Sequence, residues 1–480
     1  MRKITAEMSN RFLWNLREQQ VELHSLCLYQ DGEMLLKKAY APFSEGSLHP
    51  VYSVSKSFLS VLIGWLVEEG KLKLSDAWLS YFPEYRRYVR DPVFETVTVR
   101  DLLTMTLGQE REAPVRDGDD WIRKIVEEPV TVKPGTRFFY NSQASFLLGV
   151  LTERASGKRY TEYLEEKILK PLGIQEYKCE TNQDGQVIAG LCLHLRTEDI
   201  AKFGIALLEE GRYGGRQVVP EAWTAEVGKM QIDNSDVIPP ENVEGCRGYG
   251  YHFWLCSQGG YRCSGLFGQL CYIWPEQKLV LTAASAASGN GAILSCFYDA
   301  IREASLETPE YTDFQIAPAA GKKSCPAGIP VKEIYSAKKN DYGIEFLEFE
   351  MEEGDETRYR ISLWRRGKRF SFEAVWGRWL SQEDHFTPFT PYIYDGAMNP
   401  AYHERFAAPR LFASCAWRDG DTLAVRLRAE DYSGTPEFAF RFLEEHTVEM
   451  DYRIGAYFTE ENALQAKFTA TKYLHRIAGA

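Results

Sequence analysis

The sequence lacks the cysteine and histidine patterns of metal-binding and disulfide-stabilised proteins. Its ten cysteines are scattered between Cys27 and Cys415, and no two of them form a Cys-x-x-Cys pair. The eight histidines are also scattered, and no group of cysteines and histidines has the spacing of a zinc site. A glycine-rich phosphate-binding loop and an internal repeat are absent as well. We therefore expect reduced cysteines that pack as small apolar side chains, no metal ion and no other cofactor.

An excess of positive charge is missing too, and so is a long apolar run. Asp and Glu number 68 against 56 Lys and Arg, which gives a net charge of −12. This balance argues against nucleic acid and against an anionic membrane surface as partners. No apolar run is long enough to span a bilayer, and residues 1–7 turn polar at once, without the apolar region of a signal peptide. The sequence therefore predicts no membrane insertion and a cytoplasmic location.

The chain is long enough for two domains, because 480 residues exceed one usual hydrophobic core. In residues 1–307, several predicted helices precede three predicted strands at 249–255, 268–274 and 279–284. Because helices flank these strands at both ends, the pattern predicts an α+β fold with an antiparallel sheet. Residues 308–330 are rich in Pro, Ala, Gly and Lys, which predicts a linker.

Residues 331–480 show a nearly all-β pattern. Apolar and polar residues alternate cleanly at 361–364, 423–427 and 438–442, and Asp419-Gly420 is a hairpin signal. This pattern predicts an accessory domain folded as a meander, a sandwich or a small barrel. Its alternate faces are rich in Phe and Trp or in Arg and Glu, which favours one core face and one solvated face over a ligand-binding barrel. The domain's role stays open between limiting access to a site and self-association into a homo-oligomer.

The most informative stretch is Ser53-Val54-Ser55-Lys56, which precedes an apolar run from Phe58 to Val67. A helix that is apolar on most sides is usually buried. Positions three apart share a helix face, so Ser53 and Lys56 are expected to point the same way. A desolvated amine has a lowered pKa and takes up a hydroxyl proton, which makes the serine a nucleophile. Taken alone, a helix-start serine with a snorkelling lysine is an equally good interpretation. A second Ser-x-x-Lys, at 336–339, has no apolar run behind it and is interpreted as chance.

Other sequence blocks, found in order along the chain, decide between these interpretations. They are Val99-Arg100-Asp101-Leu102-Leu103-Thr104, Tyr140-Asn141-Ser142 followed by Leu147-Leu148-Gly149, Pro171-Leu172-Gly173-Ile174, and Cys263-Ser264-Gly265-Leu266. With them, residues 20–300 resemble the serine β-lactamase and penicillin-binding-protein superfamily. The similarity is to the branch of class C β-lactamases, DD-peptidases, related esterases and nylon-oligomer hydrolases. The resemblance implies a β-lactamase/transpeptidase-like fold, in which an antiparallel sheet flanked by helices is joined by a helical subdomain.

The resemblance also implies roles for particular residues. Ser53 matches the family nucleophile, Lys56 its partner on the helix, and Tyr140 the tyrosine of the Tyr-x-Asn motif. Lys56 and Tyr140 are then the proton-transfer partners of Ser53. The backbone N–H groups of Ser53 and Leu266 are expected to form the oxyanion hole.

Two motifs depart from the family pattern. Ser142 stands where the family usually has an asparagine that helps to hold the lysine and a substrate amide; its other interpretation is a helix N-cap. Cys263, Ser264 and Gly265 occupy the place of the Lys-Thr-Gly or His-x-Gly motif and are predicted to orient substrate, but the cation of that motif is missing. We expect Cys263 to be an ordinary cysteine rather than a nucleophile, and His252 to be a surface or core histidine.

Three functions follow from these residues. The favoured one is a serine hydrolase that cleaves a small amide or ester through an acyl-enzyme on Ser53. The second is a true β-lactamase or DD-peptidase that acts on penicillins or peptidoglycan peptides, which the missing cation disfavours. The third is a catalytically weakened descendant that acts as a binding protein, which the intact set of Ser53, Lys56 and Tyr140 disfavours.

Overall fold

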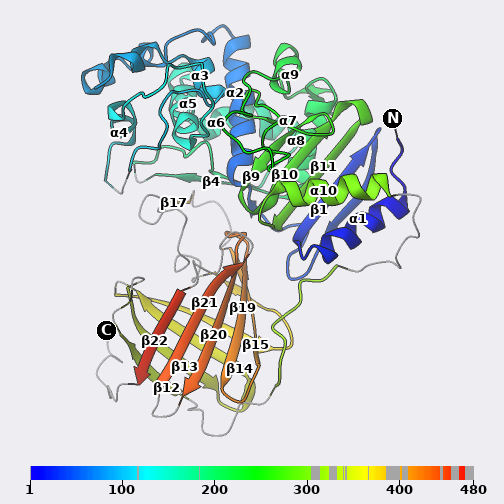
Figure 1. The fold of residues 1–480 in the computed structure, drawn as a ribbon, viewed down its shortest axis with the longest axis vertical. Helices are drawn as coiled ribbons and strands as arrows, with labels where there is room; N and C mark the ends of the chain where they lie inside the picture. The colour runs from blue at the N-terminus through cyan, green and yellow to red at the C-terminus, as the bar shows by residue number, and fades with distance from the viewer. Residues whose placement is uncertain are drawn as a thin grey trace. The chain divides into compact units, whose positions relative to one another are not determined.

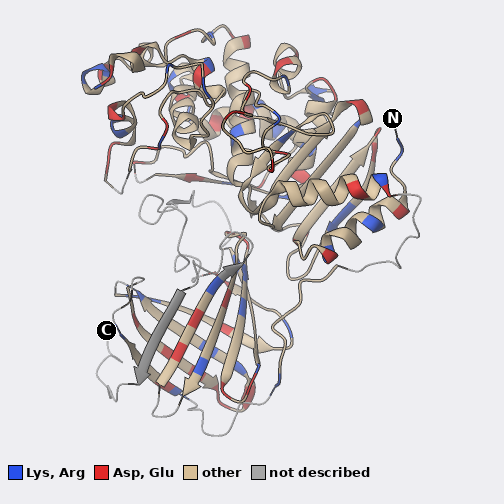
Figure 2. Ribbon diagram, in the orientation of Figure 1, with Lys and Arg blue, Asp and Glu red and all other residues tan. Residues whose placement is uncertain are grey.

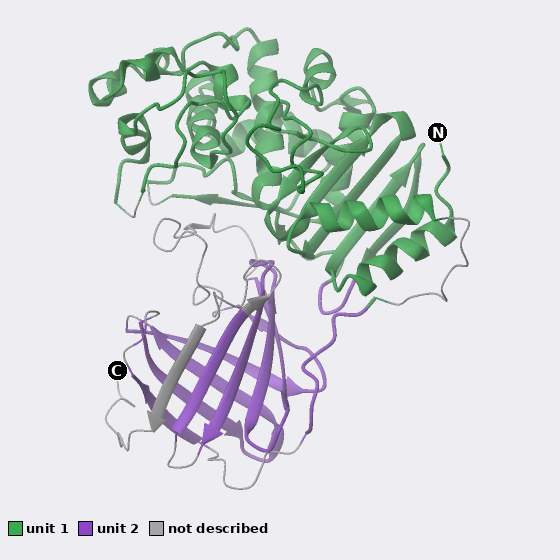
Figure 3. Ribbon diagram, viewed as in Figure 1, with its two compact units in different colours: residues 1–39, 44–314, 393–406 green, residues 40–43, 315–392, 407–480 purple. Residues whose placement is uncertain are grey.

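The computed structural model describes most of the chain, and the described residues form two compact units (Figure 3). The described residues are 2–115, 118–182, 184–303, 314–323, 332–338, 340, 343–365, 367–384, 401–402, 409–443, 447–455 and 464–470. The first unit consists of residues 1–39, 44–314 and 393–406, and the second of residues 40–43, 315–392 and 407–480. Residues 308–313 and 324–330 of the predicted linker lie outside the described residues, so the domain boundaries at 307 and 331 stay predictions.

The first unit is built around a six-stranded sheet with the strand order β2-β1-β11-β10-β9-β8 (Figure 1). Every neighbouring pair in this sheet is antiparallel. Its strands are β1 (Glu22–Gln30), β2 (Glu33–Ala39), β8 (Trp254–Leu255), β9 (Tyr261–Gly265), β10 (Gln269–Trp274) and β11 (Leu279–Ala286). Two smaller sheets contain β3 (His49–Pro50), β4 (Lys178–Thr181), β5 (Leu193–Leu195) and β17 (Ala401–Tyr402), and β6 (Arg212–Tyr213) with β7 (Arg216–Gln217). The predicted α+β fold with an antiparallel sheet is confirmed.

Helices cover the sheet and form a helical part beside it (Figure 1). They are α1 (Ala6–Glu18), α2 (Ser55–Glu68), α3 (Val99–Leu103), α4 (Trp121–Glu127), α5 (Ser142–Ser156), α6 (Tyr160–Leu164), α7 (Lys170–Leu172), α8 (Thr197–Leu208), α9 (Glu221–Val227) and α10 (Asn290–Arg302). α1 and α10 pack together, and α8 packs against β1, β10 and β11. A Cβ added at Gly204 of α8 would lie 2.7 Å from Cys271 Sγ, so this helix needs glycine to approach the sheet so closely. In the described part of the chain, no helix has the length and apolar character needed to cross a bilayer.

Helix α2 forms the centre of the first unit, as its apolar run predicts. Eleven of its fourteen residues are buried, including polar Ser55, Lys56, Ser57 and Ser60. It packs against α5, which is also buried on most sides. Gly70, with a φ of 67°, lies just past the helix C-terminus, where left-handed backbone is common. A helix surrounded by apolar neighbours takes most of its side chains out of water, and Lys56 is one of them.

Three local predictions need correction. The strand predicted at 249–255 is only β8, because His252 has a φ of 62° and breaks the extended run. The sequence Thr197-Glu198-Asp199 predicts an N-cap at Thr197, but Thr197 is the first residue of α8 and the N-cap is Arg196, which makes no side-chain capping bond. Ser142 is not the N-cap of α5: Asn141 takes that place, and its side chain accepts a hydrogen bond from Gln143 N at 2.8 Å. Asparagine is among the strongest capping residues, so the cap leaves the neighbouring serine hydroxyl to contact other groups.

The second unit is all β, as predicted, and of the three proposed forms it takes the small barrel. Its strand order is β15-β14-β13-β12-β22-β21-β20-β19-β18-β16, and a parallel pairing of β15 with β18 closes the ring. The strands are β12 (Lys332–Ala337), β13 (Ile344–Glu352), β14 (Asp355–Arg365), β15 (Lys368–Trp376), β16 (Leu380–Glu383), β18 (Arg410–Trp417), β19 (Thr422–Ala429), β20 (Thr435–Leu443), β21 (Thr447–Gly455) and β22 (Leu464–Ala470). In the second Ser-x-x-Lys, Ser336 lies on strand β12, and Lys339 lies outside the described residues.

Aromatic side chains fill part of the ring's interior. The Phe349 ring lies 5.3 Å from that of Tyr359 and 5.0 Å from that of Phe442, between ring centres. The Trp417 ring lies 5.6 Å from Phe442, and its Nε1 donates to the Tyr359 hydroxyl at 2.9 Å. All four side chains are buried, so strands from different parts of the sequence meet in one aromatic core.

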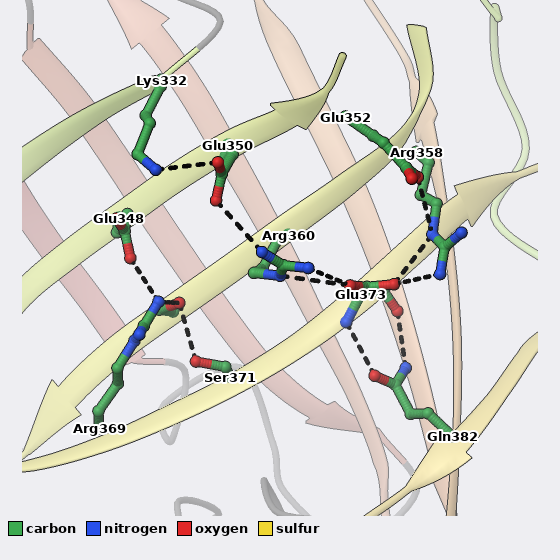
Figure 4. A network of polar contacts seen from close by, with 11 residues as sticks. Lys332, Glu348, Glu350, Glu352, Arg358, Arg360, Arg369, Ser371, Glu373 and Gln382 are labelled. Carbon is green, nitrogen blue, oxygen red and sulfur yellow. Dashed lines mark hydrogen bonds and ion pairs between the residues drawn. The ribbon is translucent and has the colours of Figure 1, made fainter. Parts of the chain in front are cut away.

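Charged residues of both signs lie along the strands of the ring (Figure 2). On β12 to β16 these charges form a continuous network (Figure 4). Arg360 pairs with Glu373 at 2.7 Å and with Glu350 at 3.5 Å, and Glu350 also pairs with Lys332 at 2.9 Å. The Arg360 side chain is half exposed. The alternation of buried aromatic and exposed charged residues along these strands is the predicted pattern of one core face and one solvated face.

Candidate functional site

Ser53 and Lys56 are held together by a change of helix type. Ser53 lies in a single 3₁₀ turn, η1 (Tyr52–Val54), which leads directly into α2, where Lys56 is the second residue. Lys56 Nζ lies 3.0 Å from Ser53 Oγ, a hydrogen-bond distance. Ser53 is partly exposed, whereas Lys56 is 1% exposed. A substrate can therefore reach the hydroxyl from one side, and the amine contacts it from the protein interior.

The Lys56 amine is buried, and the polar groups that contact it are neutral. Nζ donates to the carbonyl oxygen of Gly190 at 3.0 Å and to Ser142 Oγ at 3.4 Å, besides its contact with Ser53. Burial lowers the pKa of Lys56 to about 7, against a smaller opposing effect of the charge of Glu112. Because a buried ammonium without a paired carboxylate loses its hydration, the neutral amine becomes accessible near neutral pH.

Tyr140 lies beside the same amine. Lys56 Nζ is 5.0 Å from the centre of the Tyr140 ring. The ring stacks on that of Trp254 at 5.5 Å, and it makes an edge contact with that of Tyr249 at 6.4 Å. Tyr140 is itself partly exposed. Lys56 thus lies close to both Ser53 and Tyr140, although 84 positions separate Lys56 from Tyr140 in the sequence.

The two backbone segments predicted to form the oxyanion hole are neighbours. Leu266 begins the turn η6 (Leu266–Gly268), which follows β9, and η1 packs against β9. At Gly265, an added Cβ would lie 2.3 Å from the carbonyl oxygen of Val51, so only glycine permits this approach. The first N–H groups of a helical turn have no partner within the turn. The segments that carry Ser53 and Leu266 are therefore neighbours, and the oxyanion-hole role of their N–H groups stays a prediction.

A pair of strained aromatic residues flanks these two segments. Tyr52 directly precedes Ser53 and has a φ of 46°, and Phe267 directly follows Leu266 and has a φ of 57°. Their rings lie 5.6 Å apart. The Phe267 carbonyl oxygen accepts a hydrogen bond from Ser285 Oγ at 2.9 Å. Left-handed backbone is costly for bulky residues, so packing and hydrogen bonds hold both turns in this form.

The third predicted motif is only partly exposed. Cys263 is completely buried and lies opposite Cys271 in the pairing of β9 with β10, which disfavours direct contact with a substrate. Ser264 is half-buried, and its hydroxyl donates to Asn290 Oδ1 at the start of α10. The neighbouring cation Arg262 does not replace the missing one. Its guanidinium is buried and donates to the carbonyl oxygens of Leu255 and Glu244, both at 2.9 Å.

Two residues near Lys56 escaped the sequence analysis. Gly190 was missed, although an added Cβ there would lie 3.2 Å from Lys56 Nζ and 2.8 Å from Ser145 Cβ. Glu112 was also missed; its Oε1 accepts a hydrogen bond from Ser142 N at 2.5 Å. No sequence signal identifies either one, because both positions are defined by contacts with distant segments.

His252 is a core histidine, as one of the two predicted interpretations had it. It is 2% exposed, and its Nε2 lies 3.2 Å from Ser145 Oγ. Burial lowers the pKa of His252 well below its ordinary value, and the nearby charge of Lys56 lowers it further. The imidazole is therefore neutral at physiological pH and adds no positive charge to the surroundings of Lys56.

Comparison with known proteins agrees with the fold. A protein-family model described as Beta-lactamase matches residues 11–293, more than half of the 480-residue chain. Protein flp of Staphylococcus aureus (strain MW2) is 27% identical over 164 residues, which cover 31% of this chain and 33% of that protein. The match thus spans about a third of the length of this curated relative.

Two solved structures are similar in fold. EstCE1, described as a hydrolase with promiscuous acyltransferase activity, has a TM-score of 0.51 and 15% identity, over 62% of this chain and 98% of that one. The structure of SurE with D-Leu has a TM-score of 0.50 and 18% identity, over 97% of this chain and 100% of that one. The second similarity extends over the β-rich C-terminal part as well as the first unit.

Proposed function

We propose, from the premise that the chain belongs to the Beta-lactamase family, that it is a serine hydrolase cleaving a small amide or ester through an acyl-enzyme on Ser53. One observation carries the proposal: Ser53 Oγ lies 3.0 Å from a buried amine. Since burial lowers the pKa of that amine, on Lys56, to about 7, its neutral form is populated near neutral pH.

The reaction begins with acylation. Neutral Lys56 accepts the Ser53 proton as Oγ attacks the substrate carbonyl carbon, and the carbonyl oxygen becomes an oxyanion. The N–H groups of Ser53 and Leu266 stabilise that oxyanion. Tyr140 passes a proton to the departing amine or alcohol as the bond to the carbonyl carbon breaks. The acyl group is then an ester of Ser53, and the leaving group departs neutral.

Deacylation reverses these roles with water. A water molecule loses a proton to the Lys56 and Tyr140 pair and attacks the ester carbonyl, and the proton returns to Ser53 Oγ as the ester bond breaks. The sum is one amide or ester plus one water giving one acid plus one amine or alcohol. Ser142 and Gly190 keep Lys56 Nζ on the side facing Ser53 through both steps.

The missing cation separates this proposal from a true β-lactamase or DD-peptidase. In those enzymes, the cation of the third motif helps to receive the substrate carboxylate. In this chain Cys263 stands at that place, and the guanidinium of Arg262 is buried in bonds to two backbone carbonyls. A substrate without a carboxylate at this position fits these residues better.

Intact-protein mass spectrometry tests the proposal directly. The native chain, Ser53→Ala and the control Ser55→Ala are each incubated with a fluorophosphonate and, separately, with a penicillin. Ser55 lies two residues from Ser53, and its hydroxyl accepts a hydrogen bond from Leu193 N at 3.0 Å. It is therefore a nearby serine that is not the proposed nucleophile.

We expect a single fluorophosphonate adduct on the native chain and on Ser55→Ala, and none on Ser53→Ala. An adduct that persists in Ser53→Ala moves the nucleophile elsewhere. A native chain that never reacts supports the binding-protein alternative, and stoichiometric acylation by penicillin supports the β-lactamase alternative.

A further inference from the structure

Glu112 is fixed at the edge of the proposed site by two contacts with helix α5. Its Oε1 accepts a hydrogen bond from Ser142 N at 2.5 Å. The next residue, Ala113, is clamped by Gln143, whose Oε1 accepts from Ala113 N at 2.8 Å and whose Nε2 donates to the Ala113 carbonyl at 2.7 Å. The carboxylate therefore has a defined position at the first turn of α5, rather than the freedom of a surface side chain.

This position is close to the reacting groups. Ser142, whose N–H holds Glu112, also contacts Lys56 through its hydroxyl, and Lys56 contacts Ser53. Hydrogen-bond lengths of roughly 3 Å along this path bring the carboxylate within about 12 Å of Ser53 Oγ. The charge of Glu112 raises the pKa of Lys56, as expected for a carboxylate this close to the amine. Glu112 is half-buried, so part of this residue is accessible to solvent.

In the part of the chain that the structure describes, no Lys or Arg side chain forms a salt bridge with Glu112. Arg111, which precedes it in the chain, pairs with Glu128, and Arg137 pairs with Glu110. The third motif, which carries a cation in related enzymes, has a buried Cys263. Glu112 thus adds a carboxylate at the edge of a site whose third motif lacks the cation of the family pattern.

We propose that Glu112 binds a protonated amino group on the acyl part of the substrate, and that the chain therefore selects amino-bearing amides or esters. This inference rests on the proposed hydrolase function and names its substrate class. One oxygen of Glu112 stays on Ser142 N, and the other accepts a hydrogen bond from the substrate ammonium. Charge-assisted hydrogen bonds are roughly twice as strong as neutral ones, so the amine contributes strongly to selection.

A purely structural role for Glu112, as an acceptor for the first turn of α5, makes a different prediction. The variant Glu112→Gln keeps an oxygen acceptor for Ser142 N and removes only the charge. A structural role predicts equal effects on all substrates. A role in binding an amine predicts an effect on amino-bearing substrates alone.

The test compares two isosteric substrate pairs, in which an ammonium is replaced by a methyl group. The pairs are glycyl and propionyl p-nitroanilide, and 6-aminohexanoyl and heptanoyl p-nitroanilide. kcat/KM is measured for the native chain, Glu112→Gln and the control Glu110→Gln, whose exposed carboxylate pairs with Arg137. The ratio of kcat/KM within a pair cancels any change in Lys56 protonation, because both substrates use the same base.

We expect the native chain and Glu110→Gln to prefer the amino member of at least one pair. In Glu112→Gln, that preference is expected to fall by about tenfold to a hundredfold, the range for a hydrogen bond to a charged group. The pair that shows the preference reports the distance between the amine and the scissile carbonyl.

A ratio that is unchanged in Glu112→Gln, or a native preference for the methyl member, overturns the inference. So does a native chain that reacts with a fluorophosphonate at Ser53 yet cleaves neither amino-bearing substrate. If the native chain fails to react with the fluorophosphonate at all, the proposed hydrolase function fails first, and the inference fails with it.

Discussion

The two units treat charge in opposite ways. In the first unit, Lys56 is 1% exposed, and the groups that contact its amine are two hydroxyls and a carbonyl. In the second unit, Arg360 is half exposed and pairs with Glu350 and Glu373 (Figure 4). Burial without a paired carboxylate shifts the pKa of a charged group. An exposed group with charged partners keeps the charge that it has in water.

The buried lysine costs stability, and its pKa gives the pH range of that cost. The pKa of Lys56 is about 7 in the folded chain, and an unfolded lysine has a pKa near 10.4. Above pH 10.5 both states are neutral and the cost vanishes. As the pH falls toward 7, the unfolded state alone takes up the proton, so folding loses about 4 kcal/mol by pH 7 and no more below it.

The largest expected effect is that of Lys56→Met. Removing the base is expected to slow fluorophosphonate labelling of Ser53 at least about 1,000-fold. The same change is expected to raise the urea midpoint of unfolding, because methionine carries no charge to desolvate, with part of the gain offset by three lost hydrogen bonds. Labelling rates and urea midpoints at pH 7 and pH 10 measure the two effects.

The comparison of pH values is the control for Lys56→Met. The gain in stability is expected at pH 7. It is expected to be nearly gone at pH 10, where burying Lys56 costs the native chain little free energy of folding. A midpoint that falls equally at both pH values would show that the amine stabilises the fold, and the contrast between the two units would then be lost.

Tyr140→Phe is expected to have the next largest effect. It keeps the ring that stacks on Trp254 and loses only the hydroxyl, so the fold is expected to stay intact. Turnover of a p-nitroanilide is expected to fall about a hundredfold or more, the usual range for loss of a proton-transfer group. Phe138→Leu, a change in a buried ring that is not part of the proton path, is the matched control. Equal losses in both variants would give Tyr140 a packing role only.

The pH dependence of labelling is expected to follow the pKa of Lys56. The neutral amine is the active form, so the rate is expected to rise about tenfold per pH unit below pH 7 and to level off above about pH 8. Because the charge of Glu112 raises the pKa of Lys56, Glu112→Gln is expected to move this limb to lower pH. A labelling rate that rises only near pH 10 would show that the Lys56 amine is exposed to water.

The smallest effect is expected in the second unit. Arg360→Ala removes a cation with two carboxylate partners, yet exposed pairs of this kind contribute only about 0.2–1 kcal/mol. The urea midpoint is expected to change little, with the difference shrinking further at 1 M salt, and Ser53 labelling is expected to be unaffected. A loss of several kcal/mol would place the network among the main stabilising contacts of the ring.

Local pattern explains which parts of the fold the sequence predicted well. The apolar run behind Ser53 predicted the buried helix α2, and the spacing of Thr98 and Asp101 is that of a capping box, which the structure contains at α3. The alternation in the second half predicted its strands. Errors occurred at boundaries, where His252 ends a strand by its left-handed backbone and Asn141 takes the cap expected of Ser142.

The sequence by itself determined that Ser53 and Lys56 lie close together, because a spacing of three residues places them on one side of a turn regardless of the rest of the chain. Only the tertiary structure decided how that amine behaves. Gly190 and Glu112 reach Lys56 from segments 134 and 56 residues away along the chain, and burial lowers the pKa of the lysine to about 7. Desolvation and charge act through space, so these properties depend on packing rather than on order along the chain.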